Sequence, residues 1–171
     1  MASIISEIEA KPIATGPALG ITAAVIIALI GFIALGAWID VAPLYAGFLF
    51  VWLWSTLDTM DFKALAPSLV GALAGTGMSY LLQLGTHTAN VQFIVLALLL
   101  MIIALFCVIA KRLPTLCNAS TMLFITVLNA PPVQQHEDFR AITAAIVLSV
   151  LWFGGITWII GWVVAGRAAR I

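Results

Sequence analysis

The residue types that could do chemistry gather between residues 114 and 130. The stretch PTLCNASTMLFITVLNA is apolar overall but carries hydroxyl and amide side chains. An amide facing lipid would leave its hydrogen-bond donors and acceptors unpaired, which costs on the order of several kcal/mol. These side chains should therefore face protein, water or a solute. On a helical wheel, one arc of about 140° holds five of them: Thr115, Asn118, Thr121, Thr126 and Asn129.

Two interpretations of this polar arc remain open. Hydrogen bonds to neighbouring helices would satisfy the Thr and Asn side chains inside the protein. Alternatively, the arc borders a hydrated path, and its five residues are candidate pore-lining or solute-lining residues. The opposite side of the same wheel carries Met122, Leu123 and Ile125, with Phe124 nearby.

A second pattern is a stripe of small residues in SLVGALAGTGMS. Small residues mark the contact faces of membrane helices because they let backbones approach closely. Gly71 and Gly75 form a GxxxG pair, and a glycine-lined path is the alternative to helix packing. The stripe falls within about a 100° arc and yields four candidate helix-packing residues: Ser68, Gly71, Gly75 and Ser79.

Composition decides which elements must position these residues. The chain has 171 residues, of which 64% are hydrophobic and 8% are charged, against about 25% charged residues in soluble domains. Runs such as FIVLALLLMIIALF do not alternate as the strands of a membrane barrel would. The sequence therefore predicts an all-α integral membrane protein.

Six apolar segments follow along the chain. Four are long enough to span a hydrocarbon core of about 30 Å: 18–39, 64–84, 91–110 and 141–166. Two shorter ones, 43–57 and 114–130, begin with Pro43 and Pro114, which suit the first turn of a helix. Each short segment either crosses or re-enters the bilayer. Asp40 is expected to cap the first of them.

Charge placement favours six crossings. Six basic residues would then lie on one side, where positive charge indicates the cytoplasm, with only Arg140 on the other. If 43–57 were re-entrant, Lys11 would move to the other side, and the bias would weaken to five basic residues against two. We therefore expect both termini in the cytoplasm, with an interfacial lead-in over 1–17, one transmembrane domain over 18–166, and a basic tail over 167–171. The six are Lys11, Lys63, Lys111, Arg112, Arg167 and Arg170.

The spacing of the segments also indicates an internal repeat. A long span, a short proline-started segment and another long span occur twice, about 71 residues apart. Three crossings per unit would give the units opposite orientation, as in inverted-repeat transporters. The alternative is that any six-helix protein divides into threes.

Several functions are disfavoured by what the sequence lacks. No acid, base or histidine falls in the middle of a predicted span, so no proton relay is visible. Cys107 and Cys117 fit small buried hydrophobes, and no Cys/His spacing suits a metal. We therefore expect no enzyme, metal or cofactor, and the zero net charge gives no reason to expect nucleic-acid binding.

Three stretches carry a resemblance to a known family: APLYAGFLF, FKALAPSLVGALAGT and AKRLPTLCNASTMLFITV. From about residue 20 onward, the chain resembles the small bacterial inner-membrane proteins grouped under domain of unknown function number 1097. It departs from them after Pro114, where Leu-Cys-Asn replaces a more usual Gly and aromatic run. That family has no assigned function, so the resemblance implies the class and an inner-membrane location only.

A fainter resemblance is to one half of the urea transporter family. Pro43, Leu44 and Gly47, followed by the small residues 68–77, are similar to its first element, and Leu113-Pro114-Thr115 to its second. The resemblance implies that residues 114–121 line a pore for a small neutral solute.

Two functions are consistent with these patterns. The first is a channel or facilitator for a small neutral polar solute, working as a homo-oligomer because six short helices enclose little space. The second is a non-catalytic structural or accessory subunit, whose small-residue faces receive partner helices.

Overall fold

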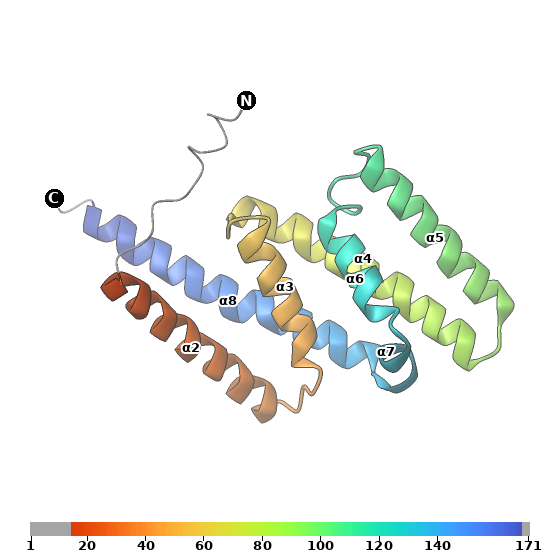
Figure 1. Ribbon diagram of the computed structural model, residues 1–171, viewed down its shortest axis with the longest axis horizontal. Coiled ribbons are helices and arrows are strands. Elements are labelled where there is room, and N and C mark those ends of the chain that lie inside the picture. Colours follow the sequence, from red (N-terminus) through yellow and green to blue (C-terminus); the bar gives the residue numbers. More distant parts are fainter. Residues whose placement is uncertain (1–14, 169–171) are drawn as a thin grey trace.

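The computed structural model describes residues 15–168, and all regular secondary structure in that range is helical (Figure 1). The prediction of an all-α protein is confirmed. Four helices, α2, α4, α5 and α8, are long and apolar enough to cross a membrane. The helices are α2 (Thr15–Trp38), α3 (Leu44–Thr56), α4 (Phe62–His87), α5 (Val91–Ile109), α6 (Ala119–Leu128), α7 (Pro131–His136) and α8 (Phe139–Ala168). Residues 1–14 of the predicted lead-in and 169–171 of the predicted tail lie outside the described residues.

The second short helix begins later than expected. Residues 111–117 form turns, with Lys111 and Leu113 at φ values of 52° and 51°, and α6 starts at Ala119. A residue before proline disfavours the helical region, and Leu113 stands before Pro114. The prediction that Pro114 starts the helix is therefore wrong, because the chain first turns and Asn118 then caps α6.

The start of α3 also differs from the expectation in detail. Pro43 precedes the helix as its N-cap residue, and no side chain makes a capping hydrogen bond there. Asp40 lies in the preceding turn at φ 58°. The expected capping by Asp40 is therefore wrong, since this residue is used to reverse the chain after α2.

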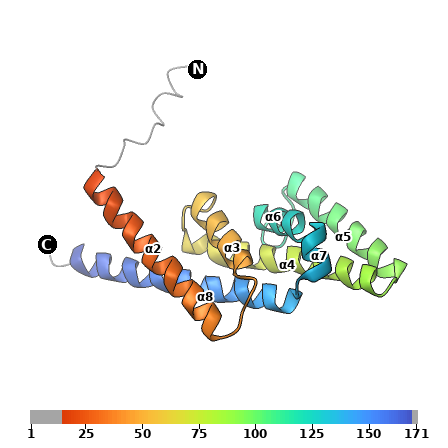
Figure 2. The ribbon, with the colours of Figure 1, turned by 60° about the horizontal axis from the view of Figure 1, so that its bottom comes forward.

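Each short helix lies along a long helix that is distant in sequence. α6 runs parallel to α4: its cap residue Asn118 meets Gly71, its middle meets Gly75, and Gln134, beyond its end, reaches the Ser79 carbonyl. In the same way α3 packs along α8, where Gly47 approaches the Ala145 carbonyl. Figure 2 shows α2 and α5 at opposite ends of this arrangement.

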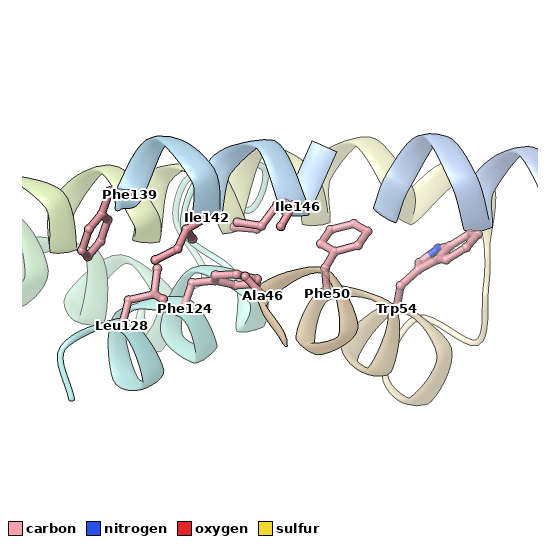
Figure 3. Packing of buried hydrophobic residues seen from close by; sticks show 10 residues of the cluster. Ala46, Phe50, Trp54, Phe124, Leu128, Phe139, Ile142 and Ile146 are labelled. Atoms are coloured by element: carbon pink, nitrogen blue, oxygen red, sulfur yellow. The ribbon is translucent and has the colours of Figure 1, made fainter. Parts of the chain in front are cut away.

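The core fills the space between the two short helices and α8 (Figure 3). Phe50 of α3 and Phe124 of α6 are both fully buried, and Ile142 and Ile146 of α8 cover them. Trp54 closes one end of the cluster, and its indole nitrogen donates to the Asp61 carbonyl oxygen at 3.0 Å. The centre of the single chain is therefore closed by apolar side chains.

The outer helices contribute little to this core. Ile27 and Ile30 of α2 are 70% and 61% exposed, and Ile102 and Phe106 of α5 are 64% and 65% exposed. In water such exposure would carry a large hydrophobic penalty. These faces have the composition of surfaces that contact lipid or another apolar partner.

Candidate functional site

The start of α6 is held by an extensive hydrogen-bond network around Asn118. Its side-chain oxygen accepts from the Thr121 backbone N–H at 3.2 Å, and the Thr121 hydroxyl accepts from the Asn118 N–H at 3.2 Å. This reciprocal capping box satisfies two backbone donors that a helix start would leave unpaired. The side-chain nitrogen of Asn118 donates to the carbonyl oxygens of Pro67, at 2.9 Å, and Pro114, at 3.2 Å. The network attaches α6 to α4.

A cavity of about 260 Å³ adjoins this network, and we call it the polar cavity. It lies where α3 ends and where α4 and α6 begin, since its walls come from all three places. The Ser68 hydroxyl donates to a carboxylate oxygen of Asp58 at 2.5 Å within it. Its walls include Leu53, Asp58, Pro67, Ser68, Asn118 and Ser120.

The Ser120 hydroxyl is the least satisfied polar group of the polar cavity. Ser120 is 1% exposed, and its hydroxyl has no hydrogen-bond partner among residues 15–168. Buried hydroxyls normally find a partner because an unpaired one costs about 1–3 kcal/mol. The same wall carries the first turn of α6, whose backbone N–H groups lack intrahelical acceptors and bear partial positive charge. The polar cavity is thus bordered by a carboxylate, by a buried hydroxyl without a partner and by the start of α6.

The structure does not bring the five residues of the predicted polar arc to one face. Thr115 lies in the turn before α6 and is exposed. Thr126 also points outward, and its hydroxyl donates to the Met122 carbonyl oxygen at 2.8 Å. This internal bond explains how a threonine can face an apolar environment. Asn129, just after the helix, donates to the Met101 sulfur at 3.4 Å.

The buried face of α6 instead combines polar and apolar residues: Ser120, Thr121, Phe124 and Leu128. The helical wheel set Phe124 near the apolar side opposite the arc, but the structure buries it completely. The difference arises because Gly75 of α4 leaves room beside the Phe124 Cβ atom and apolar residues of α3 and α8 complete the cluster around this side chain. Only Asn118 and Thr121 of the predicted arc join the network at the start of the helix.

The predicted small-residue stripe lies against α6. Ser68, Gly71, Gly75 and Ser79 are all buried. A Cβ atom added at Gly75 would lie 2.7 Å from the Thr121 carbonyl oxygen. At Gly71 an added Cβ would overlap the Asn118 amide. The glycines therefore provide the room in which α6 and its cap residue sit.

Two glutamines that the sequence analysis did not single out tie the other end of α6 in place. Gln83 of α4 donates to the carbonyl oxygens of Gln134, at 3.1 Å, and Glu137, at 3.0 Å. Gln134 in turn donates to the carbonyl oxygens of Ser79, at 3.1 Å, and Leu128, at 2.9 Å. Gln83 had a signal, because an amide inside the apolar run LLQLG needs partners. Asp58 and Ser120 had none beyond their polarity.

Fold and site together define a helical bundle with spans of membrane length and a small polar cavity at the start of a half-length helix. Within residues 15–168, no three His, Cys, Asp or Glu side chains gather where they could hold a metal ion. No family model, curated protein or solved structure matches the chain.

Proposed function

We propose that the protein is a membrane channel or facilitator for a small neutral polar solute, and that it works as a homo-oligomer. The observation that carries this proposal is the polar cavity, above all the unpartnered hydroxyl of Ser120. A neutral solute with both donors and acceptors would pair with the Asp58 carboxylate, the Ser120 hydroxyl and the α6 start. The resemblance of Leu113-Pro114-Thr115 to a urea transporter element points to the same region.

The topology we propose is six crossings, with both termini in the cytoplasm of a bacterial inner membrane. At 1.5 Å per residue, the 13 residues of α3 extend about 20 Å and the 10 residues of α6 about 15 Å. Neither would cross a hydrocarbon core of about 30 Å alone. Turns and flanking residues at the ends of each short helix would complete its crossing.

We also propose that the six helices form a 3+3 inverted repeat. Helix packing supports this, since the short helix of each half lies on the last long helix of the other half. Burial supports it too, because buried positions recur 74 residues later, close to the spacing of about 71 that the sequence indicates. The matched buried pairs include Ala46 and Ser120, Gly47 and Thr121, Phe50 and Phe124, Trp54 and Leu128, Gly71 and Ala145, and Gly75 and Ser149.

A facilitator of this kind would need to open. Phe50 and Phe124 close the core beyond the polar cavity, so passage requires α3 and α6 to move relative to each other. Inverted-repeat transporters hold their substrates beside discontinuous helices and move one repeat against the other. The polar cavity would then be the vestibule on one side of the membrane.

Solute flux into proteoliposomes tests the proposal. We expect the wild type to accelerate stopped-flow equilibration of at least one solute in a panel of small amides and polyols. Ser120→Leu should return that rate to the level of empty liposomes, because leucine would fill the polar cavity. Asp58→Asn keeps the shape of the cavity and should reduce flux more mildly.

The matched control is Thr126→Val, because Thr126 is on α6 but exposed outside the polar cavity. It should leave flux unchanged, and circular dichroism should show that all variants fold. Flux equal to that of empty liposomes for the whole panel would refute the facilitator function.

The alternative function is an accessory subunit of a membrane complex. The exposed apolar faces of α2 and α5 favour this function. Gly16 and Gly20 of α2 also favour it, because a Cβ atom added at either would meet no atom within 4 Å, which leaves room for a partner helix. Purification in mild detergent separates the two functions. A foreign subunit in stoichiometric amount supports the accessory function, whereas a homo-oligomer alone supports the facilitator.

A further inference from the structure

A second and larger cavity lies between α4 and α8, outside the polar cavity. It is an open groove of about 620 Å³, which we call the α4–α8 groove. Its walls include Thr76, Gly77 and Tyr80 of α4 and Phe139, Arg140 and Thr143 of α8. None of these residues borders the polar cavity, so the groove needs its own explanation.

The walls of the α4–α8 groove are apolar in effect. The hydroxyl of Thr76 donates to the Ala72 carbonyl oxygen and that of Thr143 to the Phe139 carbonyl oxygen, each at 2.8 Å. Both threonine hydroxyls are therefore already paired within their own helices and need no polar ligand. Gly77 adds no side chain, and nothing within 4 Å would meet a Cβ there. An apolar slot of this kind suits a hydrocarbon chain.

A tilted pair of aromatic rings in the groove lies close to Arg140, the one charged residue among the described residues that line it. The rings of Tyr80 and Phe139 lie 5.8 Å apart, and Arg140 follows Phe139 in the first turn of α8. The Arg140 side chain is exposed and has no hydrogen-bond or ion-pair partner among residues 15–168, whereas its backbone N–H donates to Asp138 at 2.9 Å. A guanidinium presents a fork of donors that matches a phosphate group.

We propose that the α4–α8 groove binds a membrane phospholipid. The acyl chain lies in the slot beside Gly77, and the phosphate contacts the Arg140 guanidinium. Glu137 and Asp138 add negative charge beside the phosphate position, so a zwitterionic ammonium headgroup is preferred over a net anionic one. This site requires that the protein lies in a bilayer but does not require solute transport.

Native mass spectrometry of the full chain in mild detergent tests the site, with phosphatidylethanolamine and phosphatidylglycerol of equal chain length as probes. We expect a wild-type adduct with phosphatidylethanolamine that Arg140→Gln weakens by about tenfold, since a charged hydrogen-bonded pair is lost. Arg112→Gln is the charge-matched control, because Arg112 does not border the groove, and it should bind as the wild type does.

Gly77→Leu tests the acyl slot independently of charge. The leucine would enter space that is open at Gly77 and should displace the lipid, whereas Gly155→Leu on α8 also enters open space but should not. Equal lipid adducts in folded wild type, Arg140→Gln and Gly77→Leu would overturn the proposal. So would a folded wild type without any adduct, and a preference for phosphatidylglycerol would overturn the headgroup assignment.

Discussion

The side-chain amide of Asn118 donates to the Pro67 carbonyl oxygen at 2.9 Å, and this bond joins the first turn of α6 to α4. Gly71 makes the bond possible, because any side chain there would occupy the space of the Asn118 amide. A helix of only 10 residues is marginal on its own. Its position therefore depends on anchors such as this one.

Asn118→Ala should destabilise the protein by about 2–3 kcal/mol. The change removes an N-cap, which contributes about 1 kcal/mol, and buried hydrogen bonds that contribute about 0.5–1.5 kcal/mol each. Asn118→Asp keeps the accepting oxygen of the cap but not the amide donors to Pro67, and should be intermediate. Unfolding in a denaturing detergent series measures the difference.

The control for this experiment is Asn129→Ala, which removes an amide at the other end of α6. Asn129 donates to the Met101 sulfur at 3.4 Å and accepts from the Gln134 amide at 3.3 Å. Both bonds are long, and Gln134 keeps its bonds to the Ser79 and Leu128 carbonyl oxygens, so a loss below about 1 kcal/mol is expected. If Asn118→Ala and Asn129→Ala destabilise equally, the α4 anchor is not important to stability.

Gly75→Ala should destabilise the protein while Gly77→Ala should not. The added methyl group at Gly75 would lie 2.7 Å from the Thr121 carbonyl oxygen and 3.0 Å from the Phe124 Cβ atom. Because backbone cannot move aside as a flexible side chain can, α6 must shift, at about 1–3 kcal/mol. At Gly77 the methyl group meets open space, and replacing a helical glycine can even stabilise. Melting temperatures in detergent compare the two, and a similar loss at both would contradict close packing of α4 on α6.

The all-helical membrane class could be predicted from the sequence. A high share of hydrophobic residues, in apolar runs long enough to span a bilayer, indicates helices that lie in lipid. The burial of α6 could not be predicted, since a helical wheel orders residues around one axis and does not say which neighbour lies on each side. Phe124 is buried because its Cβ lies against Gly75 of α4 and its side chain joins a cluster with residues of α3 and α8. Tertiary partners decide such cases.

The site was likewise only partly predictable. Asn118 was identified because an amide in an apolar segment needs partners, and its network bears out that need. Ser68 was predicted only as a packing residue and Asp58 was not singled out, and only the fold brings them together across the polar cavity. Pro114 was wrongly predicted to start the helix, because proline is also common in the turns that precede helices.

Alkylation of Cys117 should show an unusual dependence on pH. This residue lies between α5 and α6, and burial raises the pKa of its thiol, with a further contribution from Cys107. A raised pKa means less thiolate than a free cysteine has at the same pH, and the thiolate is the reacting form. In Cys107→Ala, the maleimide reaction of Cys117 should therefore keep accelerating above the pH at which an ordinary thiol levels off.

The comparison variant carries Thr115→Cys in a background with Cys107 and Cys117 both replaced by alanine. Thr115 is exposed two residues away from Cys117, so it reports an accessible thiol in the same turn. Restricted access alone would slow Cys117 without changing the shape of its pH profile. Profiles of the same shape would mean that burial affects access and not ionisation.

Single cysteines at Trp38, Met60, Arg112 and Gln135 should show on which side of the membrane each end of a short helix lies. Trp38 and Met60 flank α3, and Arg112 and Gln135 flank α6; all four side chains are exposed. Each cysteine is introduced into a background without Cys107 and Cys117 and is tested with a membrane-impermeant maleimide. If each short helix crosses, the two members of each pair react on opposite sides of the membrane. Met60 and Arg112 should both react from the cytoplasm, because Lys63 and Lys111 lie beside them. Labelling of Trp38 and Met60 from one side would make α3 re-entrant, and the two halves could then no longer be inverted copies with three crossings each.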